Sequence, residues 1–343
     1  MLRGWIAKGA GVALAAWISS GVDAAPSRSP VRIEVPGANN LQFFALWVAL
    51  GAGYFQAEGL EPNILVAPSP RSIGDRLLRG EADAALLPPP MYLGMIAENK
   101  PIVLFASLLA NEPINLVVRK DIADARNLSA QTTLPERLKA IRGVKIGLAG
   151  EVSPRLRALF TFAGLDAARD AQLLVVPGPS QVQAFVDHTV EALFAHTPYL
   201  ETALVNYQAV LVAGTSAGEV PELANGQIHA LATTRETAHA KAELITAVTR
   251  AIARAETLIH SDANATVDAL LKSGATNADR TLIEAIAEVY APAVPATPRV
   301  SAGGVMRDAT LYPAHPRAPD FTRVKAADFI APDFAEQAGT SRP

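Results

Sequence analysis

The sequence predicts an α/β fold in two lobes, each built on a mixed, mostly parallel sheet flanked by helices. Short apolar strands alternate with helical patterns along most of the chain, which is typical of parallel sheets. The chain has 343 residues, of which 50% are hydrophobic and 18% are charged. It can therefore bury a large core, and its length favours two lobes over one.

Composition excludes several classes of function. There is no cysteine, so disulfides, thiolate zinc sites and cysteine nucleophiles are impossible. The formal net charge is −3 and Lys and Arg form no run, which argues against a nucleic-acid partner. The sequence has no H-E-x-x-H motif and no cluster of carboxylates suited to calcium, so we expect neither a metal nor a cofactor.

Residues 1–24 have the features of a signal peptide. Arg3 and Lys8 form its charged part, 9–18 is apolar, and Val22 and Ala24 are small residues before the cut. We expect cleavage after Ala24 and an exported, periplasmic protein. An uncleaved membrane anchor is the alternative, although the apolar run is too short to span a bilayer.

The clearest local signals begin at Ser69. Ser69 and Pro70 favour the start of a helix, and Gly80 favours its end. The segment 82–87 reads as a strand buried on both faces, and Pro88 to Pro90 end it in a loop. Ligands of open α/β sheets bind at this carboxyl edge, so we expect part of a binding site here.

The remaining elements follow from the same patterns. We expect further strands at 31–35, 62–66, 101–107, 114–119, 144–148, 172–176, 191–195, 209–212 and 227–234. We expect further helices at 41–58, 134–141, 155–163, 181–186, 199–205, 238–260, 263–271 and 280–290. The end of the chain, 291–343, is rich in Pro and Ala, and only 326–334 is expected to pack.

Four segments carry a family resemblance: GYFQAEGLEPNILVAPSP from Gly53, then RLLRGEADAALLPPP, VKIGLAGEVSPRLRALF and VEALFAHTPYLETAL. In this order and spacing the chain resembles periplasmic substrate-binding proteins of the nitrate/taurine/alkanesulfonate group of ABC importers, which includes thiamine-precursor binders. The resemblance spans 31–334. It implies a type II periplasmic binding protein fold whose two lobes close around a ligand.

The resemblance also implies domain boundaries. Residues 31–111 would form the first part of lobe I, 112–234 lobe II, and 235–343 the second part of lobe I with a C-terminal extension. The chain would cross between the lobes near Asn111 and near Arg235.

The ligand site implied by the resemblance lies on loops at strand ends and helix starts, where free amides and short polar side chains converge. Its residues would be Asn39, Asn40, Ser69, Arg71, Pro88, Pro89, Asn111, Glu151, Ser153, His196 and Tyr199. Arg71 is alternatively a solvated residue, and His196 a structural histidine. Glu112 is expected either to bind an amine or to pair within the hinge.

Two departures from the family concern the solute. Relatives that bind small sulfonates usually have Gly or Ser where this chain has Pro88 to Pro90, and an aromatic residue at His196. Proline has no amide hydrogen to donate to an oxyanion. We therefore expect a compact organic solute in preference to nitrate or taurine. Its acidic end would be bound by Arg71, and its body would be aromatic or aliphatic.

The expected function is to capture this solute and present it, as a monomer, to an ABC transporter permease in the inner membrane. Two alternatives are a sensor for a membrane receptor and an enzyme on the same fold, such as a pyrimidine synthase or a dehydratase. Gly214 to Gly218 match the G-x-S-x-G elbow of hydrolases. Because Gly218 and Pro221 fall where the elbow needs a helix, we expect no catalytic residues.

Overall fold

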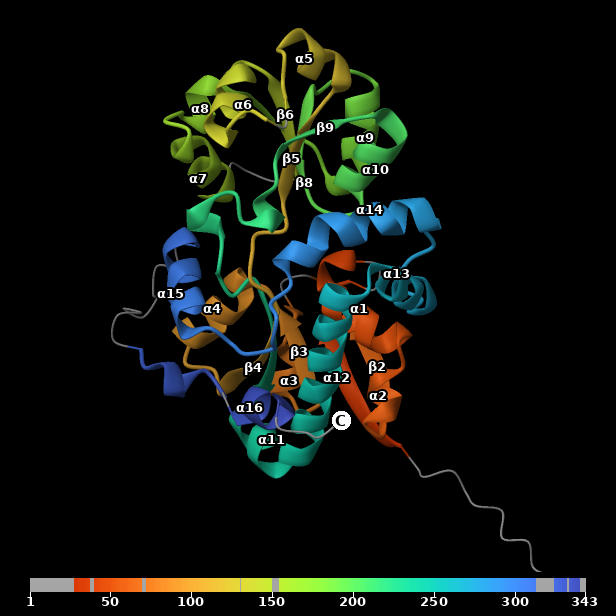
Figure 1. Cartoon of the computed structure of the whole chain (residues 1–343). Helices are drawn as coiled ribbons and strands as arrows, with labels where there is room; N and C mark the ends of the chain where they lie inside the picture. The colour runs from red at the N-terminus through yellow and green to blue at the C-terminus, as the bar shows by residue number, and fades with distance from the viewer. Residues whose placement is uncertain are drawn as a thin grey trace, which may run out of the picture.

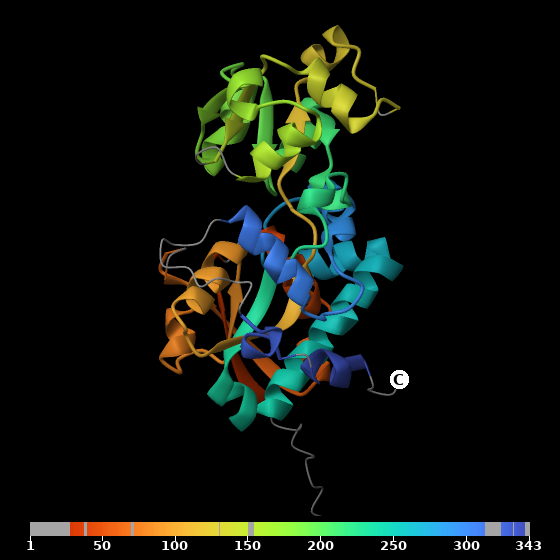
Figure 2. The same ribbon diagram turned by 90° about the vertical axis from the view of Figure 1, so that its left-hand side faces the viewer.

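The computed structural model describes residues 28–37, 40–69, 72–129, 131–149, 154–312, 324–331 and 333–339. They form two lobes stacked one above the other, joined by segments that cross between them (Figures 1 and 2). The expected leader, 1–24, lies outside these ranges. Among the described residues, no helix is both long and apolar enough to cross a membrane.

Each lobe contains one five-stranded mixed sheet. In lobe I the order is β2 (Leu60–Val66), β1 (Ser29–Val35), β3 (Ala84–Leu87), β10 (His229–Thr234) and β4 (Ile102–Leu109). In lobe II it is β7 (Gln172–Val175), β6 (Lys145–Leu148), β8 (Ala192–Ala195), β5 (Asn115–Val118) and β9 (Val210–Ala213). Only β10 and β5 run against the other strands of their sheets, which confirms the expected mostly parallel arrangement.

Helices flank both sheets. Those of lobe I are α1 (Phe44–Gly51), α2 (Tyr54–Ala57), α3 (Asp75–Leu78), α4 (Pro89–Ala97), α11 (Arg235–Ala240), α12 (Ala242–Ser261), α13 (Ala263–Lys272), α14 (Arg280–Tyr290), α15 (Ala302–Leu311) and α16 (Asp333–Gly339). Those of lobe II are α5 (Lys120–Ala125), α6 (Leu134–Ala140), α7 (Pro154–Phe162), α8 (Ala167–Asp170), α9 (Gly178–Val186) and α10 (Tyr199–Tyr207). Short 3-10 turns are η1 (Leu41–Phe43), η3 (Thr215–Ala217), η4 (Pro221–Leu223), η5 (Ala291–Ala293) and η6 (Ala326–Asp328).

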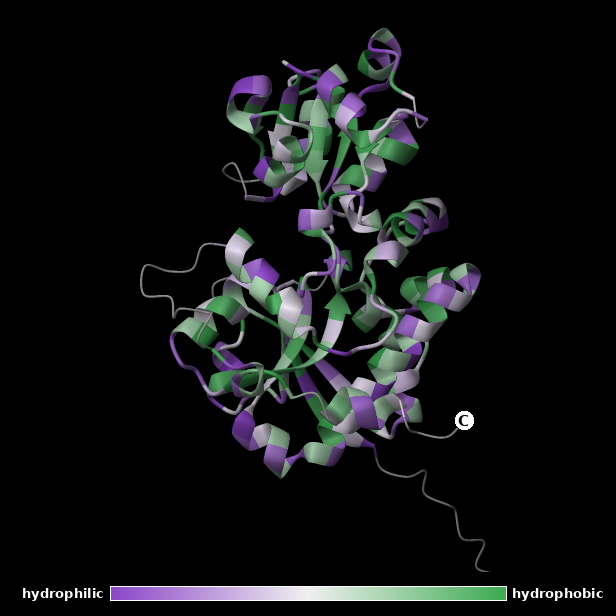
Figure 3. Ribbon diagram, turned by 60° about the vertical axis from the view of Figure 1, so that its left-hand side comes forward, coloured by the Kyte–Doolittle hydropathy of each residue, from purple (hydrophilic) through white to green (hydrophobic). Residues whose placement is uncertain are grey.

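Each sheet separates two apolar cores, because successive residues of a strand point to opposite faces. In β3, Ala84 and Leu86 face the core under α1 and α12, whereas Ala85 and Leu87 face the core under α4 and α15. The alternation explains why these strands are apolar throughout. Figure 3 shows the result as hydrophobic strands at the centre of each lobe and hydrophilic segments on the outer helices.

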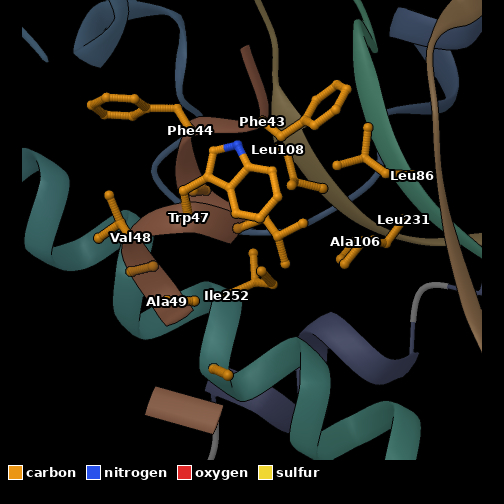
Figure 4. Close-up of a cluster of buried hydrophobic side chains, with 14 of the residues drawn as sticks. Phe43, Phe44, Trp47, Val48, Ala49, Leu86, Ala106, Leu108, Leu231 and Ile252 are labelled. Atoms are coloured by element: carbon orange, nitrogen blue, oxygen red, sulfur yellow. The ribbon is translucent and has the colours of Figure 1, made fainter. Parts of the chain in front are cut away.

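The larger core of lobe I is centred on α1. Figure 4 shows Trp47 between Phe43 and Phe44 on one side and residues of the sheet and α12 on the other. The Trp47 indole nitrogen donates a hydrogen bond to the Asn40 carbonyl oxygen at 2.7 Å. The single helix expected over 41–58 is interrupted at Gly53, which has a left-handed φ of 72°.

The helix expected to start at Ser69 starts later, at Asp75, so that prediction was wrong. Gly74 precedes it with a left-handed φ of 87°, a conformation that ends any continuous helix from Ser69. The Gly74 amide donates to the buried Glu34 carboxylate of β1 at 2.9 Å. The amide that precedes the actual helix start is therefore bonded to an internal carboxylate.

The loop expected at the three prolines is also wrong, because α4 begins there. Pro88 is its N-cap and Pro89 and Pro90 are in its first turn, where the missing amide hydrogens cost nothing. The C-terminal part was underestimated as well. In α15, Val305 and Asp308 are fully buried, so packing is not confined to 326–334.

The chain crosses between the lobes from β4 to β5 and from β9 to β10. The return was predicted at Arg235, one strand too late, because β10 pairs with β3 and β4 in the sheet of lobe I. The apolar sequence of β10 suits either sheet, so composition alone did not show to which lobe this strand belongs. The two crossovers lie side by side, since β4 neighbours β10 in one sheet and β5 neighbours β9 in the other.

The close packing of α1 on α13 yields a stability prediction. A Cβ atom at Gly51 would lie 1.7 Å from the Ala269 carbonyl oxygen, whereas one at Gly94 in α4 would meet nothing within 4 Å. We expect Gly51→Ala to lower the free energy of unfolding by about 1–3 kcal/mol through overpacking. The matched Gly94→Ala should raise it by about 0.5–1 kcal/mol. Urea titrations of both variants check this, and an unchanged midpoint for Gly51→Ala would contradict the packing.

Candidate functional site between the lobes

The carboxyl edges of the two sheets face each other across the crossovers. The chain leaves lobe I at the carboxyl end of β4, which runs parallel to β1 and β3. It leaves lobe II at the carboxyl end of β9, which runs parallel to β6 and β8. The loops after β1, β3, β6 and β8 therefore all lie on the interlobe side, where ligands of such sheets bind.

Those predicted site residues of lobe I that the structure describes lie at this edge or near it. The Asn40 side chain caps η1 by accepting from the Gln42 amide at 3.0 Å. Pro88 follows β3 directly, and Pro89 is buried. Ser69, in the loop after β2, is exposed and bonded to Ser72. Asn39, Arg71, Glu151 and Ser153 lie outside the described residues, so their roles stay predictions.

The turn after β8 brings His196 and Tyr199 to the interlobe side of lobe II. Their rings lie 5.4 Å apart, and the His196 Nδ1 atom is 2.6 Å from the Thr197 carbonyl oxygen. A carbonyl only accepts, so Nδ1 carries the proton and Nε2 is the acceptor in the neutral ring. Burial lowers the pKa of His196, which favours this neutral form.

Tyr290 connects this turn to lobe I. Its hydroxyl accepts from the Thr197 amide at 2.9 Å and donates to the Pro113 carbonyl oxygen at 2.8 Å. Its ring lies 6.5 Å from that of Phe44, at the start of α1. One buried side chain at the end of α14 thus contacts lobe I, a crossover and the predicted site turn of lobe II.

Asn111 lies in the first crossover, as predicted, with its side-chain amide bonded on both sides. Its nitrogen donates to the carbonyl oxygens of Ser216 and Pro292, and its oxygen accepts from the Asn225 amide. These partners belong to the second crossover region and to η5. Asn111 therefore fixes the two crossovers relative to each other.

The G-x-S-x-G segment forms part of the same hinge. Ser216 is buried in η3, and its hydroxyl donates to the Asn115 side-chain oxygen at 3.1 Å. The Ser216 amide and the Thr215 hydroxyl donate to the same oxygen. No α-helix begins at Ser216, so the geometry of a nucleophile elbow is not formed.

A buried ion pair lies beside the crossovers. Arg155, in the first turn of α7, approaches the Glu112 carboxylate at 2.9 Å, and Glu112 is 1% exposed. The Arg155 Nε donates to the Tyr312 hydroxyl, and its guanidinium lies over the Tyr312 ring, 4.9 Å from the centroid. Burial raises the pKa of Glu112, and the Arg155 charge opposes the rise. Of the two roles considered for Glu112, the observed contact is a pair within the hinge.

His229 is a further buried histidine at the interlobe edge of lobe I. It begins β10, packs edge-on against Phe43 at 5.2 Å, and places Nδ1 3.3 Å from the Gln42 carbonyl oxygen. Burial of its ring is the main reason that its pKa falls to about 3, and the charge of Arg155 acts in the same direction.

The described side chains at the two edges offer neutral imidazole acceptors, one paired cation, and proline and aromatic surfaces. Among the described residues, no group of three His, Asp or Glu side chains could hold a metal ion. Sequence patterns missed His229, Tyr290 and Tyr312, because each is distant in the chain from the predicted loops. A signal existed for Arg155, which directly follows the turn predicted to bind the ligand.

Solved structures share the fold of this chain. A protein from Bordetella bronchiseptica RB50 is 18% identical with a TM-score of 0.66, covering 91% of this chain and 98% of that one. The alkanesulfonate-binding protein SsuA from Xanthomonas axonopodis pv. citri, bound to MOPS, is 16% identical with a TM-score of 0.59, covering 90% and 99%. The desulfurization enzyme DSZB is 14% identical with a TM-score of 0.58, covering 91% and 99%. These likenesses confirm the two-lobed periplasmic binding protein fold.

The family follows from the sequence itself. The model of the NMT1-like family matches residues 38–271, more than half of the chain, and the chain belongs to this family. The resemblance to nitrate, taurine and alkanesulfonate binding proteins is thereby confirmed at the level of the family. A sequence search among curated proteins gave no match.

Glu201, in the first turn of α10 next to the predicted site turn, yields a prediction on pH. Burial raises the pKa of its carboxyl from 4.5 to about 7, and neither carboxyl oxygen has a hydrogen-bond partner among the described residues. Below about pH 4.5 the group is protonated in both states. Between pH 4.5 and 7 the unfolded chain ionises first, so stability falls as the pH rises.

We expect the free energy of unfolding of the wild-type protein to fall by on the order of 3 kcal/mol between pH 4.5 and pH 7.5 because of Glu201. Glu201→Gln should remove this fall. The check is the urea midpoint at both pH values. Glu288→Gln, an exposed carboxyl on α14, is the matched control and should keep the wild-type pH dependence. Equal pH dependence of all three proteins would show that Glu201 titrates normally.

Proposed function

We propose that this protein is a periplasmic solute-binding protein that holds a small organic solute between its lobes and delivers it to an ABC importer. The observation that carries the proposal is that both sheets present their carboxyl edges to one interlobe space. Polar side chains of both lobes, including His196 and His229, lie at these edges. Two side-by-side crossovers are the connection that hinge closure around a ligand requires.

The proposed contacts come from the loops at both edges. In lobe I they are Asn39, Asn40, Ser69, Arg71, Pro88 and Pro89. In lobe II they are Glu151, Ser153, His196 and Tyr199, with Asn111 at the crossover. We add His229 because its buried ring lies at the same edge as Asn40. The leader, cleavage after Ala24, periplasmic location, monomeric state and permease partner belong to this proposal.

An enzyme on this fold is the second candidate, because the fold also occurs in a desulfurization enzyme. Two observations disfavour it here. The chain has no cysteine, and the Ser216 hydroxyl is bonded to Asn115 in a turn. A sensor for a membrane receptor would use the same interlobe site, so these observations do not favour it over an importer.

The direct test is to purify the full chain from the periplasmic fraction and to identify its cargo by native mass spectrometry followed by denaturation. We expect an intact organic solute at one molecule per chain. Recovery of a chemically converted product would favour the enzyme. An empty protein that no small molecule stabilises would overturn the proposal.

The class of solute is tested by calorimetry on ligand-stripped protein. We expect aromatic or heterocyclic acids to bind in preference to nitrate, sulfate and taurine, because Pro88 and Pro89 donate no amide hydrogen. The α3 start also offers fewer amides than a free helix end, since Gly74 already binds Glu34. Tight binding of the inorganic anions alone would contradict this selectivity.

Arg71 is proposed to bind the acidic end of the solute. Loss of a charge-assisted hydrogen bond in a closed site costs about 1.5–3 kcal/mol, so Arg71→Ala should weaken binding of the recovered solute roughly tenfold to more than a hundredfold. Arg79→Ala is the matched control, because Arg79 is exposed and paired with Glu81 at 2.8 Å. Equal affinity of both variants would mean that Arg71 is only a solvated residue.

A further inference from the structure

The C-terminal segment 301–312, here called the strap, is fixed firmly to lobe I. Its Asp308 carboxylate accepts from the Tyr92 hydroxyl and from the Gln227 amide, each at 2.7 Å. The Ser301 amide donates to the Gln227 side chain at 3.0 Å. Asp308, Tyr92 and Gln227 are all fully buried. The strap therefore moves with the sheet of lobe I.

Glycines allow the strap to lie directly on the backbone of lobe I. A Cβ atom at Gly304 would be 2.7 Å from the Gly226 carbonyl carbon and oxygen. Gly226 itself lies three residues before β10, at the end of the second crossover. The strap therefore lies against the hinge and not on the outer surface.

Other side chains of the strap reach lobe II. Tyr312 contacts Arg155 of α7 through its hydroxyl and its ring face. Arg307 donates to the Pro221 carbonyl oxygen of η4 at 2.8 Å. The residues next to Pro221, Val220 and Leu223, are part of the apolar core of lobe II. Figure 1 shows α15 beside α4 of lobe I, with α7 of lobe II above it.

Glu112 completes the contact from the crossover. Its carboxylate pairs with Arg155 at 2.9 Å and accepts from the Tyr312 hydroxyl at 3.4 Å. Three side chains from lobe I, the crossover and lobe II thus meet in one buried cluster. Removing one partner of such a cluster leaves a buried charge unpaired, so the cluster resists being pulled apart.

We propose that the strap, through Tyr312 and the Glu112–Arg155 pair, sets the resting angle between the two lobes. A rotation of lobe II about the crossovers moves α7 relative to α15 and must break the contact of Arg155 with Tyr312. The contact therefore stabilises one interlobe angle in the absence of any solute. A solute that favours another angle has to offset it, so the strap also limits affinity.

The absence of cysteine makes the test direct. Glu98→Cys, at the C-cap of α4, and Lys139→Cys on α6 are both at exposed positions and give the chain two thiols, one in each lobe. Spin labels on them report the interlobe distance in solute-free protein. Tyr312→Phe removes the hydroxyl and keeps the ring. The double variant Glu112→Gln with Arg155→Gln removes both charges together, so that no unpaired charge is left to unfold the protein.

We expect one narrow distance distribution for the parent and a broader, shifted distribution for both variants. Tyr207→Phe, an exposed tyrosine of lobe II, is the control and should match the parent. If both variants are folded by thermal melting and their distance distributions are unchanged, the proposal that the strap sets the interlobe angle is wrong. Because the measurement uses no solute, failure of the proposed function would not alter its outcome.

Discussion

The two crossovers constrain this structure more than any other feature. The chain must leave lobe I from β4 and return into β10, so these two strands lie next to each other and run in opposite directions. The same condition applies to β5 and β9 in lobe II. As a result, each sheet has one reversed strand and turns its carboxyl edge toward the other lobe. The loops that could bind a solute are brought together by topology before any side chain is considered.

The sequence predicted most strands and the mixed, mostly parallel sheets, because buried strands leave a strong local pattern. It failed where a distant residue decided the local structure. The helix expected from Ser69 starts at Asp75, since Glu34 of β1 binds the Gly74 amide. β10 was assigned to the wrong lobe because its apolar sequence could pair equally well with strands of either sheet.

The candidate site was predictable to the same extent. Asn40, Pro88 and His196 lie at the interlobe edges where the strand pattern placed them, because position at a strand end follows from topology. Their contact with a solute stays a prediction. His229, Tyr290 and Tyr312 act through contacts with segments far away in the chain, and no local pattern marks them. Tyr92, which follows the three prolines closely in the sequence, is fully buried, with its hydroxyl bonded to Gln227 and Asp308. It therefore supports the hinge from inside lobe I.

The position of β10 between β3 and β4 also determines the order in which the lobes become complete during synthesis. Lobe II is one continuous stretch of chain, so all strands of its sheet are present once β9 has been made. The sheet of lobe I lacks the strand between β3 and β4 until β10 has been made, which happens after the whole of lobe II. Until then β3 and β4 each keep an unpaired edge, which is an aggregation-prone state. The lobe made first is therefore the one that is finished last.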